Sequence, residues 1–167
     1  MPNTSSLTRP STLPDKISFH RETFPPPASD FEQLFEAHGM EVRSRPFKLD
    51  FNRYADLDRA GRLVWMVARH SDAPMRPVGY SCHFWYRDLH FDERCAADDL
   101  WYVLPDFRRR GIGRQLKEMG HAVLHKAGVT RIGDNIRMGV GSQLLHKLGF
   151  EPWGIRWIKT YPAGSGN

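Results

Sequence analysis

The sequence predicts an α/β fold with a mixed, mostly antiparallel central sheet and flanking helices, and three observations favour this class. Runs with the apolar, β-branched and aromatic composition of strands are interspersed with segments whose apolar residues recur at helical spacing. The first half places strand-like runs next to one another, as in an antiparallel meander. The second half reads strand, helix, strand, which requires at least one parallel crossover. A chain of 167 residues is long enough to bury its own core.

The first 18 residues differ in composition from the rest of the chain. They are rich in Ser, Thr, Pro and Asn and have no apolar periodicity, which predicts a flexible leader. Pro25, Pro26 and Pro27 interrupt the chain again soon afterwards. We therefore expect a leader over residues 1–18 and a single domain over residues 19–167.

Two helices are expected before the main strands. The first begins at Phe31 in the stretch FEQLFEAHGMEV, and one face of it carries Phe31, Leu34, Phe35 and His38. Gly39 is expected to end this helix, because glycine readily adopts the left-handed conformation of a helix terminus. A weaker helix is expected over residues 51–60, ended by Gly61.

The remaining elements follow in close succession. Apolar and aromatic runs predict strands at 63–69, 78–86 and 98–104, the last of them cut off by Pro105. A helix should follow from Ile112 to the Ala127–Gly128 pair, because its apolar residues recur at helical spacing. The last predicted elements are a strand at 129–136, a short helix ending at Gly149 and a strand at 154–161.

Composition narrows the partners and the location. The formal net charge of +5 favours anionic partners such as phosphates or nucleic acid. No apolar run approaches the roughly 20 residues of a membrane-spanning helix, so no membrane partner is expected. The N-terminus lacks the apolar segment of a secretory signal, and only two cysteines occur, which suits a reducing compartment. These features predict a cytoplasmic protein.

Residues 98–116, DDLWYVLPDFRRRGIGRQL, carry the clearest functional pattern. A strand ends at Pro105 and a helix begins near Gly111, with an arginine-rich turn between them. Successive backbone N–H groups in such a turn, together with the positive end of the helix dipole, can bind an anion. Gly111 and Gly113 would let a pyrophosphate approach the backbone, because glycine has no Cβ. The stretch therefore predicts a site for a phosphate-bearing ligand.

Several other motifs do not occur in the sequence. It contains no GxxxxGK[ST], and both GIGRQL and GVGSQL lack the third glycine of a dinucleotide fingerprint. HExxH, CxxC and GxSxG are also absent, which argues against common zinc-protease, zinc-ribbon and hydrolase sites. His121 and His125 have the i, i+4 spacing of metal ligands, but without a third ligand a solvated helix face is the simpler interpretation. His83 is expected to be a packed histidine, and no metal is expected.

The stretch VLPDFRRRGIG closely resembles the acetyl-CoA signature of the GNAT (Gcn5-related N-acetyltransferase) superfamily, V-x-P-x-x-[RQ]-x-x-G-x-[GA]. The matching residues are Val103, Pro105, Arg108, Gly111 and Gly113. Forty residues later, LLHKLGF is similar to the family's second signature, usually LYEKLGF. The two motifs are separated by one predicted helix and one predicted strand, as in the family.

The resemblance implies a fold and a co-substrate. In this family the strand that carries the first motif has a β-bulge and splays from its neighbour, and acetyl-CoA lies in the resulting cleft. By position, the backbone of Tyr102, Val103 and Leu104 should pair with the pantetheine arm. The pyrophosphate should be held by backbone amides of the turn, formed by Arg108, Arg109, Arg110, Gly111, Ile112 and Gly113.

Family chemistry is the direct transfer of acetyl from the thioester to an amine, and the resemblance suggests residues for its proton transfers. A base must deprotonate the ammonium. Asp98 and Asp99 lead into the motif, and because successive strand residues face opposite sides, only one can face the cleft. We favour Asp99 as the base, with a solvated residue at the start of the strand as the alternative. Leu145 occupies the position of the family's usual tyrosine acid, which leaves Ser142 and His146 as candidates for the acid.

Three functions remain open at this point. The first is acetyl-CoA-dependent N-acetyltransfer to a primary amine, on either a small molecule or a protein. The second is a non-catalytic acyl-CoA-binding or regulatory module, suggested by the missing tyrosine. The third, a basic nucleic-acid-binding domain, is disfavoured because Phe107 is the only aromatic residue beside the arginines. The sequence is compatible with a monomer or a homodimer.

Overall fold

The computed structural model of the chain describes residues 16–26, 28–71, 76–134 and 142–151. The chain separates into two compact units, residues 1–135 and 136–167. The first unit contains the sheet, and the described part of the second contains the short helix α4 (Ser142–Lys147). Among these residues, no helix is long and apolar enough to cross a membrane.

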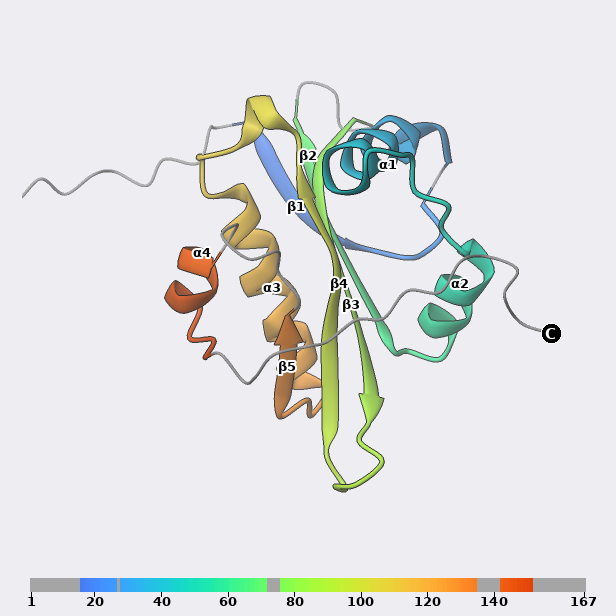
Figure 1. Cartoon of the computed structure of the whole chain (residues 1–167), viewed down its shortest axis with the longest axis vertical. Coiled ribbons are helices and arrows are strands. Elements are labelled where there is room, and N and C mark those ends of the chain that lie inside the picture. The colour runs from blue at the N-terminus through green and yellow to red at the C-terminus, as the bar shows by residue number, and fades with distance from the viewer. Residues whose placement is uncertain (1–15, 27, 72–75, 135–141, 152–167) are drawn as a thin grey trace, which may run out of the picture. The chain divides into compact units, whose positions relative to one another are not determined.

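The first unit is built on a five-stranded sheet whose order in space follows the order in sequence (Figure 1). Its strands are β1 (Ile17–Glu22), β2 (Leu63–His70), β3 (Pro77–Arg87), β4 (Arg94–Val103) and β5 (Arg131–Asp134). Neighbours from β1 to β4 run antiparallel, and β4 pairs with β5 in parallel. This arrangement confirms the predicted mixed, mostly antiparallel sheet and the parallel crossover.

Strand β1 is an element that the sequence did not predict. It pairs along β2 from Ile17↔His70 to Glu22↔Trp65. Its sequence, ISFHRE, alternates polar and apolar residues over only six positions, too short a pattern to separate from the polar leader that precedes it. The strand begins within the last two residues of the expected leader, whose first 15 residues lie outside the described part.

Helices cover both faces of the sheet. The helices α1 (Ala28–Arg43) and α2 (Phe51–Arg59) lie on one face, and α3 (Ile112–Lys126) lies on the other (Figure 1). A short 3-10 turn, η1 (Pro105–Phe107), joins β4 to the motif turn. The two layers explain why β2 is a continuous apolar run: Trp65 and Val67 pack towards α1, whereas Val64 and Met66 pack towards α3.

The prediction that Gly39 ends the first helix is wrong. Helix α1 continues to Arg43. A Cβ on Gly39 would lie 2.6 Å from the backbone oxygen of Arg45 and from the backbone nitrogen of Phe47. The glycine is therefore required by the loop that packs across the helix, and not by a left-handed helix terminus.

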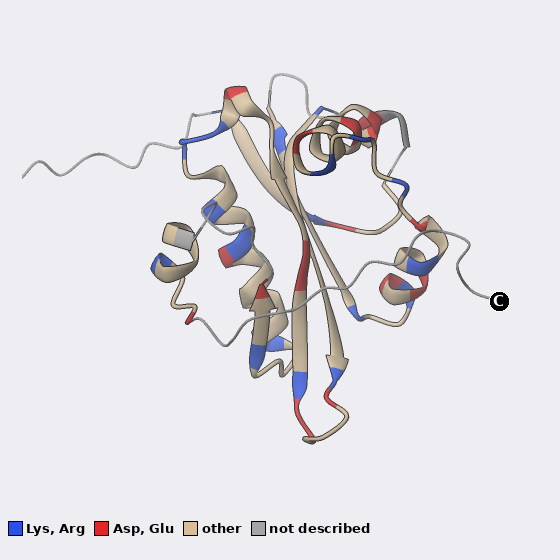
Figure 2. Ribbon diagram, viewed as in Figure 1, with Lys and Arg blue, Asp and Glu red and all other residues tan. Residues whose placement is uncertain are grey.

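Strand β4 contains the β-bulge that the family resemblance implies. Opposite β3, Cys82 pairs with Leu100 and His83 pairs with Asp98, so Asp99 is an extra, bulged residue. The described parallel pairing with β5 runs from Cys95↔Arg131 to Asp98↔Asp134. The acidic segment halfway along β4 in Figure 2 lies at the level of the bulge. The bulge is thus confirmed, and the splay stays a prediction.

The elements after β4 agree with the expectations as far as they are described. Helix α3 begins and ends as predicted, and β5 occupies the middle of the predicted strand at 129–136. Helix α4 ends two residues before Gly149. The predicted strand at 154–161 lies outside the described residues.

Candidate active site

The motif turn connects the end of β4 to the N-terminus of α3. Gly111 is the N-cap residue of α3 and has a φ of 82°, and Arg109 also has a positive φ, 62°. The first N–H groups of a helix have no partner within the helix, and Gly111 supplies no side-chain cap. The turn therefore presents backbone donors at the positive end of the α3 dipole, which is an arrangement that binds anions.

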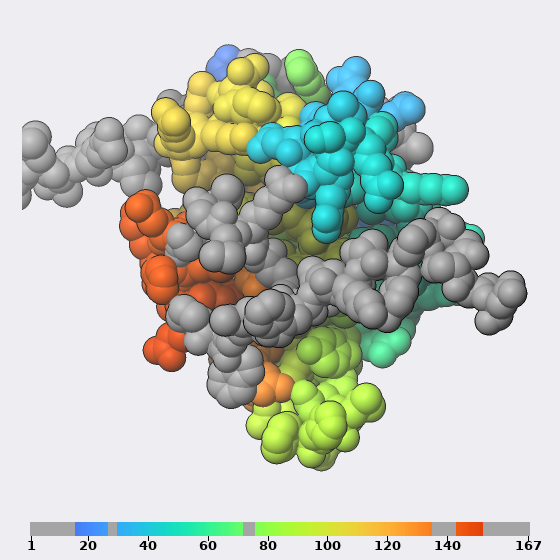
Figure 3. Space-filling model, in the orientation of Figure 1, coloured from blue at the N-terminus to red at the C-terminus, as the bar shows by residue number. Residues whose placement is uncertain are grey.

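The three arginines of the turn have different environments. Arg108 donates from Nε to the Val103 carbonyl at 2.8 Å and from its guanidinium to Glu41 of α1 at 2.6 Å. Its guanidinium also lies 5.2 Å from the centre of the Tyr102 ring. In Figure 3 the motif turn, yellow, accordingly lies beside α1, cyan. Arg108 is therefore committed to contacts within the protein, whereas Arg109 and Arg110 are exposed, with the Arg110 guanidinium 5.7 Å from the centre of the Phe107 ring.

Gly113 is needed for packing between α3 and β4. A Cβ at this position would lie 2.7 Å from Cζ2 of Trp101, whose ring fills the space beneath the helix. The sequence suggested that Gly113 leaves room for a pyrophosphate. The geometry adds a separate requirement, because α3 can approach β4 this closely only without a side chain at 113.

Of the three residues expected to pair with pantetheine, Tyr102 and Val103 are the last two of β4 and Leu104 follows directly. The Leu104 N–H donates to the Val78 carbonyl at 2.9 Å, and the Val103 carbonyl accepts from Arg108. These two backbone groups are thus already bonded within the protein. The Tyr102 side chain is buried and stacks on His38 with ring centres 4.7 Å apart.

Asp98 and Asp99 face opposite sides of the sheet, as the strand periodicity predicts. Asp99 is exposed in the bulge and accepts a hydrogen bond from the Tyr54 hydroxyl of α2. Asp98 is buried on the α3 side, where the Lys117 ammonium donates to its carboxylate. Burial raises the pKa of Asp98 to about 7, although Lys117 opposes this shift.

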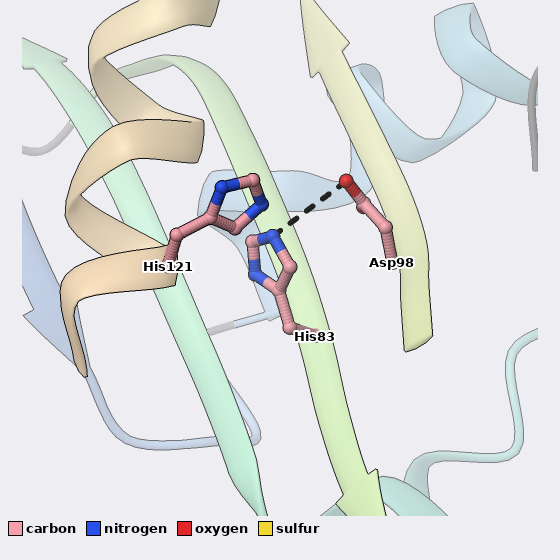
Figure 4. Close-up of side chains that lie close together, drawn as sticks. All are labelled: His83, Asp98 and His121. Carbon is pink, nitrogen blue, oxygen red and sulfur yellow. Dashed lines mark ion pairs between the residues drawn. The ribbon is translucent and has the colours of Figure 1, made fainter. Parts of the chain in front are cut away.

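Lys117 and Asp98 belong to a buried cluster that the sequence did not predict, completed by Asp134, His83 and His121. The Lys117 ammonium also donates to Asp134 at 2.6 Å, and the side chain of Lys117 is only 1% exposed. His83 Nε2 lies 3.6 Å from the Asp98 carboxylate, and the His121 ring stands against the His83 ring (Figure 4).

Both imidazoles of this cluster are neutral at physiological pH. Burial lowers the pKa of His83 to about 3, and the neighbouring His121 and Lys117 add to this shift. Burial and Lys117 lower the pKa of His121 to about 4. The cluster therefore combines one ammonium, two carboxyl groups and two uncharged rings.

One atom each from His83, Asp98 and His121 lie within 4.8 Å of one another, a spacing that could hold a metal ion. The residues that could act as ligands together with His121 are therefore His83 of β3 and Asp98 of β4, and not His125. However, the Lys117 ammonium already lies on the Asp98 carboxylate. A metal ion here would have to compete with a cation that is part of the chain.

The sequence does contain a signal for this cluster. Gly113 and Gly120 lie on the same face of α3 as Lys117, and a Cβ on Gly120 would lie 2.6 Å from the His83 ring. Two glycines on one helix face indicate close packing against the sheet. A lysine between them must therefore be buried and paired.

On the opposite face of the sheet, two buried polar side chains contact each other. The His38 Nδ1 atom and the Tyr80 hydroxyl are 2.7 Å apart, and both residues are buried. Burial is also the main reason why the pKa of His38 is lowered to about 4. This face is aromatic around His38, Tyr80 and Trp65: the Trp65 and Tyr80 rings stack, and the His38 ring is tilted against Tyr80.

The two candidate acids lie in the second unit. His146 is in α4, and the side chain of Ser142, the first residue of α4, is outside the described part. Both remain predictions from the sequence.

Comparisons with known proteins agree with the fold. A model of the acetyltransferase (GNAT) family matches residues 28–150, well over half of the chain. No curated protein matches the sequence significantly.

Many solved structures resemble the chain, at identities that establish the fold alone. An aminoglycoside acetyltransferase from an uncultured soil metagenomic sample, in complex with sisomicin, has a TM-score of 0.68 at 16% identity over 90% of this chain and 99% of its own. The glucosamine-6-phosphate N-acetyltransferase of Arabidopsis thaliana has a TM-score of 0.68 at 13% identity, over 86% of this chain and 99% of its own. A transcriptional regulator from Bacillus halodurans C-125 has a TM-score of 0.70 at 16% identity, over 87% of this chain and 99% of its own.

Proposed function

This chain belongs to the acetyltransferase (GNAT) family, and we propose that it transfers an acetyl group from acetyl-CoA to a primary amine. Acetyl-CoA supplies the activated acetyl group as its thioester. Similar structures include acetyltransferases of aminoglycosides and of glucosamine-6-phosphate, so small amino compounds are the first acceptors to examine. A protein amine is the alternative acceptor.

The observation that carries this proposal is the anion site at the uncapped N-terminus of α3. The family resemblance implies that the pantetheine arm pairs with the backbone of Tyr102, Val103 and Leu104, just before this site. Ile112, the first residue of α3, follows nine residues after Val103, the last residue of β4. Backbone donors from Arg109 to Gly113 would bind the pyrophosphate, and Arg109 and Arg110 would add positive charge.

Asp99 supports the acceptor half of the proposal. An amine is protonated near neutral pH and must lose a proton before its nitrogen can attack the acetyl carbonyl carbon. We assign that proton to the Asp99 carboxylate, either directly or through a water. Burial, and then the bond to Asp99, raise the pKa of Tyr54 above its usual range, so its hydroxyl stays protonated and orients the carboxylate.

The reaction is completed when coenzyme A leaves as its thiol. The bond between the carbonyl carbon and sulfur breaks, and the sulfur takes up a proton. Leu145 cannot donate one, so we keep Ser142 and His146 as the candidate donors and water as the alternative. We also propose that the enzyme acts in the cytoplasm and that residues 1–16, which precede β1, are a leader not needed for activity.

One observation favours a second function. Leu145 replaces the family's acid, and one structure with this fold is a transcriptional regulator. A chain that binds acyl-CoA without catalysis would use the same motif turn. Catalysis and mere binding are separated by whether coenzyme A thiol is released in the presence of an amine.

The test is a thiol-release assay of the purified chain with acetyl-CoA and a panel of amino sugars, aminoglycosides, simple amines and peptides. Thiol release with at least one amine is expected, with the rate rising with pH to a plateau as the amine loses its proton. Calorimetry should show acetyl-CoA binding without an acceptor. Binding without thiol release for any amine would instead favour the non-catalytic module, and absence of binding would overturn both.

Asp99→Asn should lower turnover by up to about 10²–10⁴-fold, the usual contribution of a positioned base. Its acetyl-CoA affinity should stay close to that of the wild type, because Asp99 lies upstream of the motif turn. Asp92→Asn is the matched control, since Asp92 is an exposed carboxylate at the β3–β4 turn that pairs with Arg87. Unchanged turnover in a folded Asp99→Asn protein would remove Asp99 from the mechanism.

A further inference from the structure

Three side chains of the kind that ligate metals meet between α3 and the sheet. His83 belongs to β3, Asp98 to β4 and His121 to α3, and Figure 4 shows the three side chains close together. One ligand atom from each lies within 4.8 Å of the other two. The tertiary fold, and not a local motif, brings these residues together.

His83 has a nitrogen without a partner that faces this group. Its side chain is fully buried, and Nε2 has no hydrogen-bond partner among the described residues. Oδ2 of Asp98 lies 3.6 Å from this nitrogen, which is beyond hydrogen-bond distance. A buried polar atom is normally bonded, so an unpartnered imidazole nitrogen directed at a carboxylate indicates a missing ligand between them.

The separation of these two atoms fits a bound ion. Zn²⁺ bonds to imidazole nitrogen and to carboxylate oxygen at about 2.0–2.2 Å, and tetrahedral coordination then places two ligand atoms about 3.3–3.6 Å apart. The observed distance of 3.6 Å between His83 and Asp98 lies within this range. His121 is only half-buried, so rotation of its ring can complete a third bond, and its side leaves a path for an ion from solvent.

The charges of the cluster also favour a cation. Asp98 and Asp134 supply two carboxylates, whereas Lys117 supplies one ammonium. Both imidazoles are neutral, because burial is the main cause that lowers the pKa of each, and the neutral ring is the form that ligates metals. With both carboxylates ionised, the cluster is therefore one positive charge short of neutrality.

Lys117 competes for Asp98 but does not close the site. Both His83 and Lys117 face Oδ2 of Asp98, so a metal on this oxygen displaces the ammonium from it. Lys117 also donates to Asp134 at 2.6 Å, and it can turn to the second oxygen of Asp98. Its ammonium therefore keeps its partners, and it orients the ligating carboxylate as hydrogen bonds behind metal ligands commonly do.

We propose that His83, Asp98 and His121 form a binding site for a divalent transition metal of the Zn²⁺ class. Two imidazoles and one carboxylate favour such metals over Mg²⁺ and Ca²⁺, which prefer oxygen ligands throughout. Three protein ligands leave a fourth position for water. The ion would join β3, β4 and α3, and its binding does not depend on the proposed acetyl transfer.

The test uses Co²⁺ as the probe, because Co²⁺ occupies Zn²⁺ sites and absorbs visible light when its coordination is tetrahedral. Untagged full-length protein is treated with EDTA, dialysed and titrated with Co²⁺. One equivalent should bind with the visible bands of a tetrahedral ion. Zn²⁺ should abolish these bands by displacing Co²⁺, whereas Mg²⁺ should not. Zn²⁺ should also raise the melting temperature, since it binds the folded chain.

Three variants locate the ion. His121→Ala removes a ligand and should lose the bands and weaken Co²⁺ binding by more than about tenfold, because even residues behind the ligands account for 10–100-fold. His125→Ala is the matched control, since His125 is exposed one turn later on the same helix. Lys117→Met removes the repulsion between two buried cations, which outweighs one orienting hydrogen bond, so it should bind Co²⁺ about tenfold more tightly.

The outcomes are decisive in each case. Absence of the tetrahedral bands in the wild type would overturn the proposal, even if Lys117→Met showed them, because the ammonium would then exclude metals from the natural chain. Equal binding by the wild type and His121→Ala, or loss of binding in His125→Ala, would place the ion elsewhere and also overturn it. If Lys117→Met does not fold, the wild type and the two histidine variants decide.

Discussion

The two faces of β4 are built from different chemistry although both are buried. On the α1 and α2 face, Leu100 and Tyr102 pack among aromatic rings, and His38 and Tyr80 bond each other without charge. On the α3 face, Asp98 meets an ammonium and a second carboxylate. The bulge at Asp99 separates these two environments along one strand.

The difference indicates which face of β4 tolerates substitutions and which face is destabilised by them. The aromatic face is stabilised by many ring contacts and apolar burial, each of which can be lost without exposing a charge. On the charged face, the attraction between Lys117 and the two carboxylates offsets the cost of removing these charges from water. Removal of one partner therefore leaves an uncompensated buried charge. The charged face also lies where the ligand cleft is proposed to begin.

The largest effect is expected from breaking the charged face. Lys117→Met keeps the length of the side chain but leaves Asp98 and Asp134 without their cation. We expect the free energy of unfolding to fall by about 3–5 kcal/mol, the cost of an unpaired buried charge. Lys126→Met, at an exposed position on the same helix, should cost less than about 0.5 kcal/mol in urea denaturation. Equal costs for the two lysines would contradict this assignment.

An intermediate effect is expected from pH, because the faces contain groups with opposite shifts. The folded pKa values of His38, His83 and His121 are lowered to about 4, 3 and 4, so the unfolded state binds more protons below about pH 6.5. Their contribution to stability is complete above that pH and is lost as the pH falls. Asp98 has a raised folded pKa of about 7, so its contribution is lost as the pH rises towards 7.

Below pH 6.5, the stability lost by protonation of the three histidines exceeds the stability gained by protonation of Asp98. Stability should therefore rise between pH 4.5 and 6 by at least about 1 kcal/mol per pH unit, since one proton corresponds to about 1.4 kcal/mol per unit. Above pH 6.5 the rise should slow, and the curve should level off near pH 8, because the histidine contribution fades over the same range as the opposing contribution of Asp98. Denaturation at several pH values measures this curve, and Asp98→Asn should steepen the rise between pH 5 and 6.5 by up to about 1.4 kcal/mol per pH unit, the value for one proton. Equal slopes in Asp98→Asn and the wild type would contradict the raised pKa of Asp98.

The smallest effect is expected on the aromatic face. Tyr80→Phe removes the hydroxyl bonded to His38 and leaves a buried nitrogen unpaired, which should cost about 1–2 kcal/mol. The surrounding rings remain, so the cost should stay below that of Lys117→Met. Tyr86→Phe, at an exposed position of β3, is the control and should have no measurable effect. A cost for Tyr80→Phe above that for Lys117→Met would reverse the comparison between the faces.

The elements that could be predicted from the sequence are those that depend on local patterns. The motif turn, the helix after it and the main strands depend on residues that are neighbours in sequence, so glycine, proline and periodicity reveal them. β1 was missed because a short strand of mixed polarity depends on its pairing with β2. Gly39 was misinterpreted because a glycine required by a distant loop has the same local pattern as one at a helix end.

By itself, the sequence determined the family motif, the α/β class, and the placement of Asp98 and Asp99 on opposite faces, because each follows from adjacent residues and strand geometry. Only the tertiary structure decided that Arg108 is held by Glu41, that Gly113 packs on Trp101, and that Lys117 joins Asp98 to Asp134. These contacts join residues 12 to 67 positions apart. Burial and the pKa of a group depend on such distant neighbours, and no local pattern of charge or polarity contains them.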